Sequence, residues 1–278
     1  MKRILFWVGL LVSFVLLTSV AIAASNTLAA IQQKGEVVIA TTGTQEPFSI
    51  MTNDGRIMGM DIDLGQFIAK AMGVTPKFVI YPFDQLHTIM ELGMVDMAIS
   101  GMTMTPARQE KMTMVGPYHI TGKSLLAHLS NAQLRAIADV KGLQDFDNPN
   151  LTLAALSGST SEQLIRAIMP KSQIWPVKGY DEAVTLMRER RVTALVADYP
   201  VCLMTIYRYP NEQLYTLPRP FTIEPLGIAI AKNNPTLEAW LANFLVTAAN
   251  DGLLDELTVR WIEQVPTWVD MLNPIPAR

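Results

Sequence analysis

The sequence predicts an α/β protein made of two similar lobes, and three observations carry that prediction. Short apolar runs alternate with amphipathic helical segments, which is the pattern of mainly parallel sheets. The stretches at residues 91–100 and 188–198, ELGMVDMAIS and RERRVTALVAD, both pass from a helix end to a buried strand that stops at a polar residue. The chain has 278 residues, a length that suits two moderate domains.

The first half is expected to alternate three strands with two helices. Apolar runs at 37–40, 77–81 and 94–100 indicate the strands. Helical periodicity covers residues 61–72 and 84–92, and the apolar side chains of the first helix fall on one face. A glycine follows that helix at once, which is typical of a helix end.

The second half repeats this order. Its expected elements are strand 151–156, helix 161–169, strand 174–177, helix 181–190 and strand 192–197. A further strand is expected at 226–231, and helices at 236–250 and 253–261 follow it. Because these last elements have no partner lobe of their own, we expect them to pack against the first lobe.

The first 23 residues have the layout of a secretory signal peptide. Lys2 and Arg3 precede an apolar run, and the segment Ala21–Ala23 offers small residues where a signal peptidase cuts. An uncleaved membrane anchor is the alternative, because the run is nearly long enough to span a bilayer. No cysteine stands at the cleavage point, so we expect an exported protein that is not a lipoprotein.

Composition and missing motifs exclude several classes of function. Lys and Arg total 22 against 25 for Asp and Glu, which leaves no electrostatic footprint of nucleic-acid binding. The single cysteine, Cys202, excludes a disulfide framework and a cysteine zinc cluster, and three histidines offer little for a metal site. The sequence contains no P-loop, no nucleophile elbow and no HExxH motif. We therefore expect neither a metal nor a cofactor.

The first of three polar strand ends spans residues 100–108, with the sequence SGMTMTPAR. Ligands of open α/β sheets bind beyond the carboxyl ends of the strands. Thr105 is a good N-cap for a short helix, and Arg108 lies in its first turn, where the helix dipole disfavours a cation by about 0.3–1 kcal/mol. A bound anion would offset that cost. The alternative is a solvated arginine that pairs with Glu91 or Glu110.

One of the other two strand ends could bind an anion, and the other supplies a carboxylate of its own. Ser159 and Glu162 have the spacing of a capping box, and free N–H groups at a helix start bind carboxylates, although ordinary capping is the alternative. Asp198 ends a buried strand and could neutralise an ammonium group or cap the next helix. Together with Arg108, these groups match the carboxylate and the ammonium of an α-amino acid.

Three longer stretches carry a family resemblance: GEVVIATTGTQEPFSIMTNDGRIMGMDIDLGQFIAKAMG, VDMAISGMTMTPARQEKMTMVGPY and LGIAIAKNNPTLEAWLANFLVTAANDGLLDELTVRWI. They resemble the periplasmic amino-acid-binding proteins of ABC importers, the bacterial solute-binding family 3, over about residues 34–262. The resemblance implies a periplasmic-binding-protein-like fold, with two α/β lobes, a two-stranded hinge and a ligand cleft. It divides the chain into a signal peptide (1–23), lobe 1 (24–120 and 222–278) and lobe 2 (121–221).

The resemblance also assigns roles to residues that match the family's motif. The residues expected at the ligand's α-carboxylate are Arg108, Thr103, Thr160 and Ser159. Those expected to hold its ammonium are Ser100, Gly101 and Asp198. The expected walls around its side chain are Gln45, Phe48, Phe83, Met102 and Tyr118.

The resemblance favours a neutral or polar amino acid as the ligand. Thr42 and Gln45 stand where members for cationic amino acids often carry an aspartate and a tyrosine, although Glu46 leaves a dibasic ligand open. The implied partners are that amino acid and an inner-membrane ABC permease. The implied protein is a periplasmic monomer that binds no nucleic acid.

Two other functions stay open beside this one. Exported cyclohexadienyl dehydratases, which aromatise arogenate or prephenate, resemble the same family and would need a general acid from Glu46, Glu224 or Asp198. The sensory domain of a receptor or lytic enzyme would need a membrane span or a catalytic domain after Ile262, where only a short tail follows. We expect a binding protein with no catalytic residues.

Overall fold

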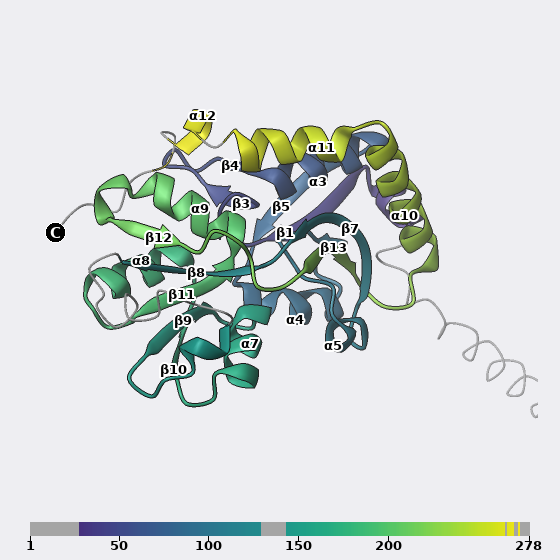
Figure 1. Cartoon of the computed structure of the whole chain (residues 1–278). Helices are drawn as coiled ribbons and strands as arrows, with labels where there is room; N and C mark the ends of the chain where they lie inside the picture. The colour runs from purple at the N-terminus through teal and green to yellow at the C-terminus, as the bar shows by residue number, and fades with distance from the viewer. Residues whose placement is uncertain (1–27, 129–142, 265, 270–271, 273–278) are drawn as a thin grey trace, which may run out of the picture.

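The computed structural model describes residues 28–128, 143–264, 266–269 and 272. Within them, two five-stranded sheets and a three-stranded sheet are flanked by helices (Figure 1). The predicted signal peptide, residues 1–23, lies outside the described part of the chain. None of the helices described there is long and apolar enough to cross a membrane.

The first sheet has the strand order β5-β1-β6-β13-β7. Its strands are β1 (Glu36–Thr41), β5 (Thr75–Ile80), β6 (Met97–Ala98), β7 (Thr113–Thr121) and β13 (Glu224–Ile230). Strand β1 pairs in parallel with β5 and β6, whereas β13 runs antiparallel to β6 and β7. Strand β13, from the last part of the chain, thus lies in the same sheet as β1 and β5.

The second sheet has the strand order β10-β9-β11-β8-β12. Its strands are β8 (Lys123–His128), β9 (Thr152–Leu156), β10 (Gln173–Val177), β11 (Ala194–Asp198) and β12 (Leu214–Thr216). Two parallel pairs are again followed by two antiparallel pairs. The prediction of two similar α/β lobes is therefore confirmed.

Helices cover both sheets. Those of the first lobe are α2 (Leu28–Lys34), α3 (Met60–Met72), α4 (Leu86–Glu91), α5 (Pro106–Gln109), α10 (Pro235–Asn250) and α11 (Leu253–Thr258). The last helix, α12 (Pro266–Val269), contacts a helix of the second lobe. Those of the second are α7 (Thr160–Ile168), α8 (Tyr180–Arg188) and α9 (Tyr199–Arg208). Short 3₁₀ or π segments are η2 (Phe83–Gln85), η3 (Leu143–Phe146), η4 (Pro210–Glu212) and η5 (Val259–Glu263).

The core forms where the apolar face of α3 meets β1. Leu64 and Ile68 on the helix are fully buried, as are Val37 and Ile39 on the strand. Full burial of each such side chain stabilises the fold by about 1.5–3 kcal/mol. Gly73 then ends α3 in the left-handed conformation, at a φ of 73°. The helix that the periodicity predicted thus ends where its glycine indicated.

The two sheets are joined where β7 runs into β8 and where the chain returns into β13 (Figure 1). Only Gly122 separates β7 from β8, and the Phe221 N–H donates to the Lys123 carbonyl at 2.7 Å. A Cβ on Gly122 would lie 2.0 Å from the Thr222 carbonyl oxygen. The two connecting segments therefore pass so closely that only glycine fits at the crossing.

A small sheet lies beside the first lobe and carries part of the predicted ligand wall. Its strands are β2 (Thr44–Gln45), β3 (Ser49–Met51) and β4 (Ile57–Met58). Phe48 sits in the turn between the first two strands. This turn is tied to α3, because the Asp61 N–H donates to the Phe48 carbonyl at 2.9 Å.

Candidate functional site

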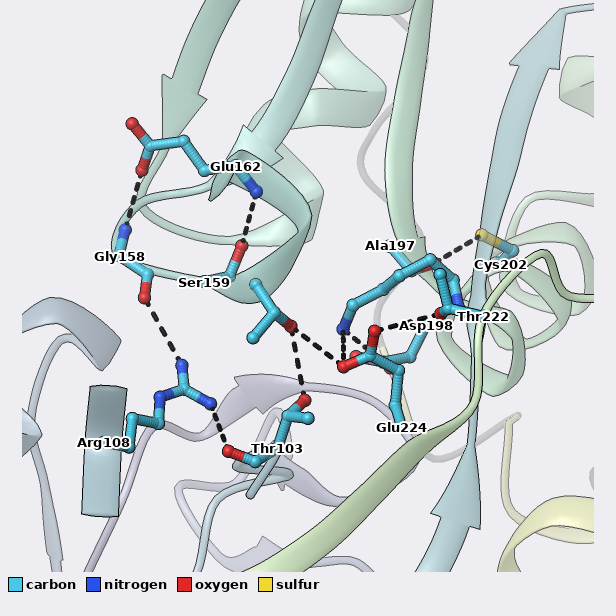
Figure 2. A network of polar contacts seen from close by, with 12 residues as sticks. Thr103, Arg108, Gly158, Ser159, Glu162, Ala197, Asp198, Cys202, Thr222 and Glu224 are labelled. Atoms are coloured by element: carbon cyan, nitrogen blue, oxygen red, sulfur yellow. Dashed lines mark hydrogen bonds and ion pairs between the residues drawn. The ribbon is translucent and has the colours of Figure 1, made fainter. Parts of the chain in front are cut away.

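Arg108 lies where the two lobes meet, at the start of a chain of polar contacts (Figure 2). Its Nη1 donates to the Thr103 carbonyl at 2.8 Å, and its Nη2 donates to the Gly158 carbonyl of the other lobe at 3.4 Å. The guanidinium carbon is 5.4 Å from the centroid of the Phe83 ring. Backbone oxygens and an aromatic face hold this cation, so its charge is available to an anion.

The local sequence sets the position of Arg108. Thr105 caps α5, since its Oγ1 accepts a hydrogen bond from the Arg108 N–H at 3.2 Å, and the predicted cap is confirmed. In the part of the chain that the structure describes, Arg108 pairs with neither Glu91 nor Glu110. Burial lowers the pKa of Arg108 to about 10, although Asp198 and Glu224 act in the opposite direction.

The facing turn of the second lobe is a capped helix start. Ser159 Oγ accepts from the Glu162 N–H at 3.2 Å, so the predicted N-cap of α7 is confirmed. Glu162 Oε2 in turn accepts from the Gly158 N–H at 2.9 Å, one residue earlier than a strict capping box requires. The hydroxyls of Thr103 and Thr160 are 3.2 Å apart and join the two lobes directly.

Asp198 ends β11 and is already paired with a lysine. Lys123 Nζ donates to Asp198 Oδ1 at 2.9 Å, and the two side chains are only 2% and 4% exposed. The residues face each other in the antiparallel register of β8 and β11. The Asp198 side chain makes no capping hydrogen bond to α9. Burial raises the pKa of Asp198, and Lys123 partly opposes this.

Sequence reasoning did not include Lys123 in the site. A signal was available, since only Ser124 separates this lysine from the apolar run Leu125–Ala127 in the first strand of the second lobe. Its role depends on its pairing with Asp198 in the strand register. Because the two residues are 75 positions apart, the sequence pattern does not show that pairing.

Glu224 links Lys123 to the threonines. Its Oε1 accepts from Thr222 Oγ1 at 3.0 Å, and its Oε2 accepts from Thr160 Oγ1 at 3.3 Å. Lys123 Nζ is 3.8 Å from Oε2. Figure 2 shows the contacts leading from Arg108 through Thr103 to Glu224 and its neighbours. Sequence reasoning had considered Glu224 only as a general acid.

The first-lobe residues around Gly101 form a buried polar layer. Ser100 Oγ donates to Thr42 Oγ1 at 3.2 Å, and the Gly101 N–H donates to Asp61 Oδ2 at 2.7 Å. Tyr118 OH donates to the other oxygen of Asp61 at 2.8 Å. Burial raises the pKa of Asp61 to about 7, although both hydrogen bonds favour the ionised carboxylate. Asp61 is a further residue that sequence reasoning missed.

The predicted wall residues are all buried, and they differ in what they touch. Gln45 lies against Gly101, where an added Cβ would be 2.5 Å from Gln45 Nε2. Its Oε1 finds no hydrogen-bond partner among the described residues. Phe48 is fully enclosed, with its ring centroid 6.1 Å from that of His119, and Met102 is 3% exposed. Of this set, Phe83 alone contacts Arg108 through a ring face.

A second contact joins the lobes away from Arg108. Arg208 of α9 pairs with Glu46, which is 6% exposed, and donates to both carboxylate oxygens of Asp181 at 2.6 and 3.0 Å. Asp84 of η2 also accepts from Ser157 Oγ at 3.1 Å. The lobes are therefore in direct contact on both sides of the polar chain. Among the described residues, no group of three His, Cys, Asp or Glu side chains is placed to hold a metal ion.

Comparison with known proteins decides the family. The family model of bacterial extracellular solute-binding proteins, family 3, matches residues 37–264. The chain belongs to this family. The match covers both lobes and all the polar contacts between them. Members of the family are extracellular or periplasmic binding proteins, as the resemblance implied.

Several relatives are amino-acid-binding proteins. The ABC transporter glutamine-binding protein of Bacillus subtilis is 28% identical over 245 residues, which cover 87% of this chain and 86% of that protein. The L-cystine-binding protein of Escherichia coli K12 is 23% identical and covers 83% of this chain and 84% of its own. Arginine-binding protein 1 of the same organism is 25% identical, with 82% and 91% covered.

Solved structures point the same way. A binding component of an ABC transporter from Wolinella succinogenes, in complex with lysine, superposes with a TM-score of 0.78 at 30% identity over 85% of this chain and 99% of that one. An ancestral amino-acid-binding protein, described as a precursor of cyclohexadienyl dehydratase, gives 0.76 at 32% identity, with 84% and 99% covered. This solute-binding protein thus shares its fold with amino-acid binders.

Proposed function

We propose that this protein captures an amino acid with a neutral or polar side chain between its lobes and delivers it to an inner-membrane ABC permease. It would act as a periplasmic monomer without a cofactor, after a signal peptide is removed behind Ala23. The observation that carries the proposal is the position of Arg108, whose guanidinium donates to carbonyl oxygens from both lobes and pairs with no carboxylate of the described residues.

The carboxylate of the ligand fits the Arg108 end of the polar chain. A guanidinium presents a planar fork that matches a carboxylate. Thr103 supplies a hydroxyl from the first lobe, and Thr160 supplies one from the N-terminus of α7, where backbone N–H groups favour an anion. A ligand bound here would be held by both lobes at once, which supports hinge closure on binding.

A neutral side chain fits the wall better than a cationic one. Glu46, the acidic residue that left a dibasic ligand open, is paired with Arg208. A cationic side chain would have to displace that arginine. Gln45 instead presents a buried amide oxygen with no partner among the described residues, which suits a hydrogen-bond donor on a neutral ligand. Ser100 and Gly101 supply further polar atoms in the same layer.

A thermal-shift screen of the common L-amino acids tests the proposal. A ligand at 100 times its dissociation constant stabilises the folded state by about 2.7 kcal/mol. We expect a clear rise in melting temperature with one or a few neutral amino acids. A screen in which only arginine and lysine raise the melting temperature would contradict the neutral assignment, and a screen without any shift would contradict amino-acid binding.

A cyclohexadienyl dehydratase is the second candidate, favoured by the similarity to the ancestral precursor of such an enzyme. Of the three acids considered, Glu46 and Asp198 are held by Arg208 and Lys123, so Glu224 is the remaining candidate for a proton donor. Incubation with prephenate or arogenate, followed by ultraviolet absorbance, tests it. Aromatic product formed at catalytic rates would replace the transport proposal with an enzyme.

A further inference from the structure

Asp198 does not offer an unpaired negative charge to a ligand. Lys123 Nζ lies 2.9 Å from one of its oxygens, and both side chains are almost completely buried. An incoming ammonium placed against Asp198 would also lie beside the ammonium of Lys123. Two like charges in a buried site repel strongly, because little water screens them. The strand-end aspartate therefore has its cation built into the chain.

Glu224 is the carboxylate of this group that Lys123 does not hydrogen-bond. Its closer oxygen is 3.8 Å from Lys123 Nζ, too far for a hydrogen bond. The hydrogen bonds that its oxygens accept come from the neutral hydroxyls of Thr160 and Thr222. Its side chain is 12% exposed, against 4% for Asp198, so it is also the more accessible carboxylate. One lysine and two carboxylates together leave one negative charge in excess.

We propose that Glu224, and not Asp198, receives the ammonium of the ligand, while Lys123 neutralises Asp198 and holds it in place. This inference rests on the proposed function. Thr160 touches both Glu224 and Thr103, and the Thr103 carbonyl accepts from Arg108. The excess negative charge and the available positive charge thus lie at the two ends of one short polar chain.

The charge balance specifies the ligand class. Arg108 and Lys123 contribute two positive charges, and Asp198 and Glu224 contribute two negative ones. A zwitterion adds no net charge, and each of its ends meets an opposite charge. A carboxylate without an amine would leave Glu224 only a share of the Lys123 charge, 3.8 Å from its Oε2 and hydrogen-bonded to Asp198, and a buried charge that is only partly paired is costly. The site should therefore prefer an amino acid to the corresponding 2-hydroxy acid.

The test compares two variants and a control by calorimetry. The probes are the common L-amino acids, each measured beside its 2-hydroxy acid. Glu224→Gln keeps the shape of the side chain and removes its charge. Lys123→Met/Asp198→Leu removes the built-in ion pair and leaves Glu224 in place. Glu256→Gln, at an exposed position on α11, is the control for loss of a glutamate charge.

We expect wild type, the control and the double variant all to prefer the amino acid. Glu224→Gln should weaken amino-acid binding by about 10- to 100-fold, because a hydrogen bond to a charged group is lost, and should leave the hydroxy acid nearly unaffected. If the double variant does not fold, the comparison of Glu224→Gln with Glu256→Gln decides alone.

Amino-acid preference that survives in Glu224→Gln would overturn the inference but leave the proposed function intact. A wild-type protein that prefers the 2-hydroxy acid would also overturn it, because the ammonium would then gain nothing from Glu224. If wild type binds none of the probes, the proposed function falls as well, and the inference falls with it.

Discussion

The cations at the two ends of the polar chain have different partners. At one end, Arg108 is held by two carbonyl oxygens and a ring face and has no carboxylate partner in the described chain. At the other end, Lys123 is enclosed with Asp198 and lies near Glu224. We call these the arginine end and the lysine end. The first has a positive charge to offer, and the second has a negative one.

A buried charged residue therefore indicates a ligand site only when its partners within the chain are known. A strand-end aspartate taken alone suggests an ammonium site, but the register of β8 and β11 has already supplied the ammonium. An arginine in the first turn of a short helix taken alone suggests a surface residue. Its half-buried position over Phe83 makes it the better anion site.

The largest expected effect comes from the lysine end. Lys123→Met leaves Asp198 and Glu224 buried without a cation, which should lower the free energy of unfolding by about 3–5 kcal/mol. Removing both members of the pair in Lys123→Met/Asp198→Leu should restore the part of the loss that comes from Asp198, while Glu224 still lacks the lysine. Urea denaturation measures both variants. A Lys123→Met protein as stable as wild type would show that the lysine end is not a tight ion pair.

The arginine end should show the opposite behaviour, with a loss of binding and little loss of stability. Arg108→Ala should weaken binding of the amino acid found in the screen by about 2–5 kcal/mol, because the buried ligand carboxylate loses its partner. Arg108→Lys should also weaken it, since the two-pronged contact is lost. Calorimetry with Arg56→Ala, an exposed arginine, as the control checks this. Near-native affinity in Arg108→Ala would show that Arg108 does not bind the carboxylate of the ligand.

Two buried aspartates differ in their partners, and the difference should appear in how stability depends on pH. Asp198 has a lysine, whereas Asp61 has only the Gly101 N–H and the Tyr118 hydroxyl, and burial raises its pKa to about 7. The folded state therefore keeps a proton on Asp61 that the unfolded state loses near pH 4. Stability from this group is full below that pH and is lost as pH rises towards 7, by at most about 1.4 kcal/mol per pH unit.

The variant Asp61→Asn isolates this contribution. Its free energy of unfolding should change less between pH 5 and pH 7 than that of wild type, in urea titrations made at each pH. Asp255→Asn, at an exposed position on α11, is the control for the loss of an aspartate charge. Parallel pH profiles for wild type and Asp61→Asn would mean that Asp61 is ionised in the folded protein throughout this range.

The smallest effect is expected at the threonine that joins the two ends. Thr160→Val keeps the volume and removes the hydroxyl that contacts Thr103 and Glu224, so binding should weaken by about 0.5–1.5 kcal/mol. Thr236→Val, at an exposed position, should change nothing. Calorimetry with the same amino acid measures both, and an unchanged affinity in Thr160→Val would place the ligand away from this link.

Local signals in the sequence predicted the elements that place the arginine end. The caps at Thr105 and Ser159 follow from side chains that reach only three residues along the chain. The alternation of strands and helices predicted the parallel pairs of both sheets. Strand β7 was not predicted, because Gly116 and Pro117 interrupt its apolar pattern. Strand pairing to β13 holds this segment extended in spite of them.

Long-range partners could not be predicted in the same way. Asp198 meets Lys123 through strand register, and Glu46 meets Arg208 across the lobes at a separation of 162 residues. Spacing along the chain carries no information on such pairs. Local patterns therefore indicate groups suited to a zwitterion but not which of these groups already has a partner within the chain.

A crystal structure with the amino acid identified in the screen would show which carboxylate receives the ammonium. We expect the ligand between the lobes, with its carboxylate oxygens about 2.7–2.9 Å from the Arg108 guanidinium and its ammonium facing Glu224. The Lys123–Asp198 ion pair should be intact beside it. A carboxylate bound to Lys123, or an ammonium on Asp198 with Lys123 displaced, would show that the two ends of the polar chain do not bind the ligand in this way.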